Sequence, residues 1–161
     1  MIDAHAVDLG PYGLLLVNLA LLSMIGWALW KTEKNISSQS DMIVLGLLGI
    51  FAVSGRILLE PIPNVQPVTV IVLMSGIYFG FTRSVILATS VALVSNIFLG
   101  HGLWTLYQAF GWSLIGLIGS LLSDKLHSKN ITSNTPLMII AALSGFIFDW
   151  TVSLSVLHTL G

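Results

Sequence analysis

Three ionisable side chains, Arg56, Glu60 and Asp149, lie in or at the ends of stretches that are otherwise apolar. Placing such a group inside a bilayer costs about 2.5–3.5 kcal/mol, so each one needs a partner or a purpose. Arg56 and Glu60 are four residues apart, which places them on one face of a helix. Either the two neutralise each other, or Arg56 presents its planar donors to a ligand that Glu60 or Asp149 orients. We expect Asp149 to face the interior of a helical bundle.

Two further segments carry polar groups suited to binding a solute. Between residues 60 and 69, three prolines hold the chain extended, and Asn64, Gln66 and Thr69 offer directed donors and acceptors. We expect this segment to face a ligand.

The second segment, residues 95–112, contains a Gly-His-Gly turn followed by aromatic and amide side chains at helical spacing. Trp104, Gln108 and Trp112 share one helix face, and Asn96 precedes the turn. An aromatic-lined pocket with a few amides suits a small organic ligand. His101 in the turn could be a gate, a metal contact or a solvated loop residue, and we expect the last.

The composition places these residues in a membrane. Of 161 residues, 55% are hydrophobic and 8% are charged, against about 25% charged in soluble domains. The net charge of −1 gives no basic field for nucleic acid, and no cysteine is present. The four histidines are scattered, and neither a phosphate-binding loop nor a serine-nucleophile motif occurs. We therefore expect no enzyme activity, no metal and no cofactor.

The elements that must position the polar residues are apolar runs without the alternation of a β-barrel strand. We predict an all-α, polytopic bundle forming a single membrane domain over residues 1–161. The first run lacks the basic start of a signal peptide, so we expect a permanent helix there. The six predicted spans are Tyr12–Trp30, Met42–Leu59, Val68–Phe81, Ser84–Leu99, Trp104–Ser123 and Pro136–His158.

The basic residues predict the orientation of these spans. Five of the six fall in the first, third and fifth connections, namely Lys31, Lys34, Arg83, Lys125 and Lys129. The positive-inside rule makes that side cytoplasmic. We therefore expect a multi-pass protein of the prokaryotic plasma membrane, with both termini outside. Small residues four apart, such as Gly76 and Gly80 or Gly116 and Ser120, predict closely packed helices.

Two sequence blocks carry a resemblance to a known family. Gly55-Arg56 followed by Pro63-Asn64-Val65-Gln66-Pro67, and then Ser95-Asn96 followed by Gly100-His101-Gly102-Leu103-Trp104-Thr105 and Gln108, resemble the substrate-binding S components of energy-coupling factor (ECF) vitamin transporters. The cobalamin-type S components are the most similar group. His101 and Leu103 stand where that group usually has Gln and Pro.

The resemblance implies a subunit that captures a vitamin-like solute, with cobalamin favoured, at the extracellular face. It further implies docking onto a transmembrane T component driven by two cytoplasmic ATPase subunits. The S-component-like core would span residues 42–158 without the usual last helix, and 12–30 would be an additional N-terminal helix. Gly46, Gly49 and Ala52 would form the partner interface.

The residues expected to bind the solute are Arg56, Asn64, Gln66, Thr69, Asn96, Trp104, Gln108 and Asp149. Two other functions compete with this interpretation. One is a non-transport anchor or assembly subunit of the membrane. The other is a small autonomous carrier coupled to protons through Glu60 or Asp149, although no internal repeat of the kind found in many such carriers is visible.

Overall fold

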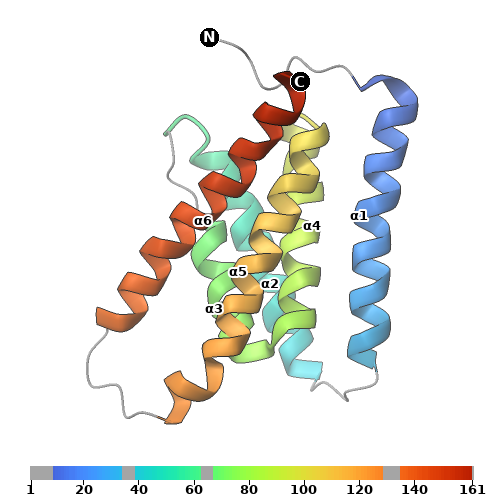
Figure 1. The fold of residues 1–161 in the computed structure, drawn as a ribbon. Helices are drawn as coiled ribbons and strands as arrows, with labels where there is room; N and C mark the ends of the chain where they lie inside the picture. Colours follow the sequence, from blue (N-terminus) through green and yellow to red (C-terminus); the bar gives the residue numbers. More distant parts are fainter. Residues whose placement is uncertain (1–8, 34–38, 63–66, 129–134, 161) are drawn as a thin grey trace.

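The computed structural model describes residues 9–33, 39–62, 67–128 and 135–160, and in these ranges the regular structure is entirely helical. The six helices are α1 (Gly10–Glu33), α2 (Gln39–Leu58), α3 (Val68–Phe79), α4 (Phe81–Leu99), α5 (Leu103–Ser128) and α6 (Thr135–Leu160). Successive helices run in alternating directions through one bundle (Figure 1). The prediction of an all-α bundle is confirmed.

Five of the described helices are long and apolar enough to cross a membrane, and α3 is the exception. Its 12 residues span about 18 Å, compared with about 30 Å for the hydrocarbon core of a bilayer. Large apolar side chains cover the outside of the bundle: Leu47 on α2 is 61% exposed and Phe146 on α6 is 79% exposed. Soluble monomers rarely expose apolar surface on this scale, so lipid is the surface's natural surrounding. The protein is a multi-pass membrane protein.

The centre of the bundle is formed by α3, α4 and α5. The short helix α3 is the most buried of the three, and it packs along α5 with α4 beside both. A Cβ atom added to Gly76 of α3 would lie 2.2 Å from the carbonyl oxygen of Gly116 on α5. One added to Gly119 would lie 2.4 Å from the carbonyl oxygen of Leu73. The two backbones are therefore in direct contact, because the glycines have no side chain that would hold them apart.

A single glycine joins α3 to α4. Gly80 has φ +83° and ψ 173°, a conformation that L-residues with a side chain rarely adopt. The predicted helical hairpin is confirmed, but its turn is shorter than expected, and α4 begins at Phe81 instead of Ser84.

The helix ends that carry basic residues lie together at one end of the bundle. Arg83, in the first turn of α4, forms an ion pair of 3.3 Å with Asp41, in the first turn of α2. Lys31 in the last turn of α1 lies at the same end (Figure 1). We call this the basic end. Lys34 and Lys129 lie outside the described residues.

Candidate functional site

The opposite end of the bundle contains a buried polar cluster around Arg56. Arg56 lies in the last turn of α2 and is only 4% exposed. Its Nη1 atom donates to the hydroxyl of Ser95 on α4 over 2.6 Å. Its guanidinium carbon lies 5.0 Å from the centre of the Trp112 ring on α5, a cation–π contact. Gly55 allows this approach of α2 to the bundle, since a Cβ there would lie 2.6 Å from the ring of Pro67.

Trp112 connects four helices. It is completely buried, and its indole nitrogen donates to the hydroxyl of Thr69 on α3 over 3.3 Å. Phe148 of α6 stacks on its ring at a centroid distance of 4.7 Å and an angle of 7°. With Arg56 contributed by α2, the indole holds this end of the bundle together. Sequence reasoning placed Trp112 on the face of Gln108 but did not include it among the site residues.

A second part of the cluster joins α4 to the start of α5. The side-chain nitrogen of Asn96, which is 1% exposed, donates to Thr105 Oγ1 and to Gln108 Oε1, both over 2.8 Å. Thr105 Oγ1 also accepts from the backbone N–H of Gly102 over 3.3 Å and lies 3.1 Å from His101 Nδ1. Asn96, Thr105 and Gln108 therefore form one continuous network with the turn.

The network fixes the protonation of the His101 ring. Thr105 Oγ1 already accepts two N–H groups, so its own proton points to Nδ1, and the proton of the neutral imidazole is assigned to Nε2. Burial lowers the pKa of His101 below its usual value, which favours this neutral form. The expectation of a solvated loop residue is wrong, because Nε2 of His101 is buried.

Three polar atoms of the cluster are buried and have no hydrogen-bond partner within the described part of the chain. They are Arg56 Nε and His101 Nε2, which are donors, and Asn96 Oδ1, which is an acceptor. Buried polar groups in folded proteins are nearly always paired, and an unpaired one costs about 1–3 kcal/mol. The two nitrogen atoms can therefore donate hydrogen bonds to a ligand, and Asn96 Oδ1 can accept one from it.

The polar cluster lies in a part of the chain that matches a known protein family. Residues 36–156 match DUF6580, a family of unknown function, and make up about three quarters of the chain. The chain belongs to this family. No curated protein and no solved structure matches it. Every residue of the polar cluster falls within the DUF6580 region, whereas α1 precedes that region.

Four of the eight predicted site residues belong to the cluster: Arg56, Thr69, Asn96 and Gln108. Trp104 is half-buried in the first turn of α5, where its ring fills the space that a side chain at Gly102 would need. It packs on the turn, and Trp112 makes the aromatic contact with Arg56.

Asn64 and Gln66, also predicted to bind the solute, lie outside the described residues.

The structure does not support the ion-pair alternative for Glu60, and the expectation for Asp149 is wrong. Glu60 follows the end of α2 and is exposed, and although both residues are described, no ion pair joins it to Arg56. Asp149 is exposed on α6 and does not face the bundle interior. The inner face of α6 is set by Ser144, Phe148, Thr151 and Ser155, and the 100° step from Phe148 turns Asp149 outward.

The expected partner surface is also divided. Gly46 is exposed and Gly49 is half-buried, but Ala52 is completely buried. The buried stripe of α2 runs through Leu45, Ala52 and Arg56, so Ala52 belongs to the core. Gly46 and Gly49 border a hollow of about 270 Å³ between α2 and α4.

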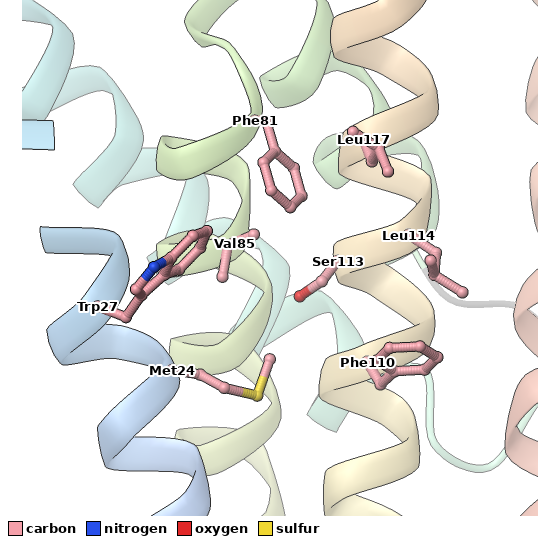
Figure 2. A pocket seen from close by; sticks show the side chains of 8 residues that line it. All are labelled: Met24, Trp27, Phe81, Val85, Phe110, Ser113, Leu114 and Leu117. Atoms are coloured by element: carbon pink, nitrogen blue, oxygen red, sulfur yellow. The ribbon is translucent and has the colours of Figure 1, made fainter. Parts of the chain in front are cut away.

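A separate apolar hollow of about 180 Å³ lies between α1, α4 and α5 (Figure 2). The hydroxyl of Ser113, which lines the hollow, donates to the carbonyl of Ala109 in its own helix. The hollow is comparable to the cavity of about 150 Å³ that remains dry and binds benzene in an engineered protein. It is lined by Met24, Trp27, Phe81, Val85, Phe110, Ser113, Leu114 and Leu117.

Among the described residues, no group of three His, Cys, Asp or Glu side chains could hold a metal ion.

Proposed function

We propose that this protein is the solute-capturing subunit of an ATP-driven importer of the ECF type. The observation that carries the proposal is the set of three unpartnered atoms, Arg56 Nε, His101 Nε2 and Asn96 Oδ1, at one end of the bundle. The resemblance to S components rests on the same two sequence blocks, residues 55–69 and 95–108. The resemblance to S components and the unpartnered buried atoms therefore concern the same part of the fold.

The chemistry of these atoms suits a ligand with carbonyl and amide groups. A carboxamide supplies both kinds of partner, since its oxygen accepts from Arg56 or His101 and its nitrogen donates to Asn96. Cobalamin carries several such groups at its periphery, which supports it as the favoured solute. Because Asn96 and Arg56 are almost completely buried, only a small arm of a large ligand would reach them.

The position of the basic residues supports the direction of transport. Lys31 and Arg83 lie at the end opposite to the Arg56 cluster. On the positive-inside rule, we propose that the cluster and both termini lie at the extracellular side of a prokaryotic plasma membrane. Energy would come from a T component and two ATPase subunits, because this sequence has no nucleotide-binding motif. Gly46 and Gly49, beside the hollow on α2, are the proposed contact for the T component.

A titration tests solute capture directly. The purified protein is titrated with cobalamin and a panel of other vitamins, following tryptophan fluorescence corrected for absorption. We expect saturable quenching by one compound. Arg56→Gln should weaken its affinity about tenfold or more, because a hydrogen bond to a charged group contributes about 1.5–3 kcal/mol. Arg83→Gln is the matched control, since it removes an arginine at the basic end.

The other outcomes identify the competing functions. If the folded protein binds no compound on the panel, the non-transport membrane subunit becomes the better explanation. If cells take up the solute without any ATPase partner, and an uncoupler stops that uptake, the protein is an autonomous carrier. If Arg56→Gln and Arg83→Gln lose the same affinity, the solute does not bind at the Arg56 cluster.

A further inference from the structure

Asp149 places a carboxyl group within the apolar part of α6. The apolar stretch of this helix is Thr135–Ser155, and Asp149 lies four residues, about 6 Å, from its centre. The hydrocarbon core extends about 15 Å to either side of the bilayer centre. Asp149 is therefore surrounded by hydrocarbon unless protein covers it.

The side chain points away from the bundle. Phe146, Asp149, Trp150 and Ser153 have the i, i+3, i+4, i+7 spacing of one helix face, which we call the Asp149 face. Phe146 is 79% exposed and Trp150 is 77% exposed. The four residues border a hollow of about 450 Å³ together with Ile147.

Nothing in the described part of the chain satisfies the carboxyl group. Within the described part of the chain, the hydrogen bond at Asp149 involves its backbone carbonyl, which accepts from the hydroxyl of Ser153. Lipid chains offer no donor, and ionisable groups in membrane helices normally face a partner or a water-filled space. A bare carboxyl group on a lipid-facing surface therefore calls for a donor that the described residues do not provide.

We propose that the Asp149 face binds a transmembrane helix of a different protein, one that carries a lysine or arginine at the same depth. Charge complementarity selects the partner's basic residue, and the exposed Phe146 and Trp150 supply apolar contact on both sides of it. A second copy of this chain does not fit. A twofold axis along the membrane normal would bring two Asp149 side chains to the same depth, where they repel each other.

The cations whose side chains the structure describes cannot supply the donor. Arg56 is buried in the cluster, and Lys31 and Arg83 lie at the basic end of the bundle. Binding of a basic helix at the Asp149 face does not require the proposed transport function. The assay below contains no solute and no ATPase, so its failure leaves the solute titration untouched.

The test uses a defined probe, a 21-residue polyleucine helix with one central lysine. The chain has no cysteine, so Met138→Cys on α6 gives one site for a fluorescent donor. Energy transfer to labelled peptide is then measured in lipid vesicles for three peptides, with a central lysine, leucine or aspartate. We expect the lysine peptide to associate about tenfold more strongly than either of the others.

Variants of the protein locate the contact. Asp149→Leu should abolish the preference for the lysine peptide, and Asp149→Asn should reduce it. Asp124→Asn is the matched control, because it removes an exposed carboxylate at the far end of α5 and should keep the preference. Equal association of all three peptides would overturn the proposal, as would a lysine preference that persists in Asp149→Leu.

Discussion

The contact between α3 and α5 gives a prediction whose size follows from the structure. A Cβ at Gly76 would lie 2.2 Å from the carbonyl oxygen of Gly116, and backbone atoms cannot move aside as a flexible side chain does. Overpacking of this kind costs about 1–3 kcal/mol. Alanine regains about 0.5–1 kcal/mol from its higher helix propensity. We therefore expect Gly76→Ala to lower the free energy of unfolding by about 1–2 kcal/mol.

A matched variant isolates packing from helix propensity. Gly46 lies in the interior of α2, and a Cβ there would meet nothing within 4 Å, so Gly46→Ala should be neutral or slightly stabilising. Thermal unfolding in detergent measures both. For a chain of this size, Gly76→Ala should lower the Tm by about 2–8 °C. If the two variants shift the Tm equally, α3 and α5 are not in backbone contact and the central packing described above is wrong.

Three further predictions concern the polar groups. Thr105→Val keeps the size of the side chain but removes the acceptor for Asn96, and it should cost about 1–3 kcal/mol in thermal unfolding; an unchanged Tm would show that the network contributes nothing. The lowered pKa of His101 means that the folded state binds fewer protons, so stability should be lost as the pH falls below about 6.5; His101→Gln should remove that part of the pH dependence of the Tm. The partly exposed pair of Arg83 and Asp41 should show a coupling of about 0.2–1 kcal/mol in a double-mutant cycle, and high salt should reduce it.

The helices could be predicted from the sequence because their signal is strong and local. Continuous apolar runs of about 20 residues have few alternatives to a membrane helix, and glycine and proline mark their ends. The end points differ where the turn is unusual. Gly80 alone connects α3 to α4, and sequence spacing does not reveal that a single residue with positive φ is enough.

The members of the polar cluster were harder to predict, because they depend on which helices become neighbours. Arg56 and Asn96 could be singled out, since an ionisable or amide group in an apolar run needs a partner. Trp112 could not, because a tryptophan in such a run is ordinary packing until Arg56 is placed against its ring. The rotation of α6 was equally hidden. Apolar residues lie on every side of α6, so the sequence contains no polar face that would have indicated an outward position for Asp149.

Arg56 and Asp149 are ionisable residues in membrane helices, and the fold accommodates them in two different ways. Arg56 is enclosed by a serine hydroxyl and an indole ring, and its Nε atom is buried without a hydrogen-bond partner among the described residues. Asp149 has no such enclosure and faces the lipid side of α6. Since an unsatisfied polar group is costly in either place, each calls for a binding partner that the described residues do not supply. We therefore propose different partners for the two groups: a polar solute for Arg56 and a basic transmembrane helix for Asp149.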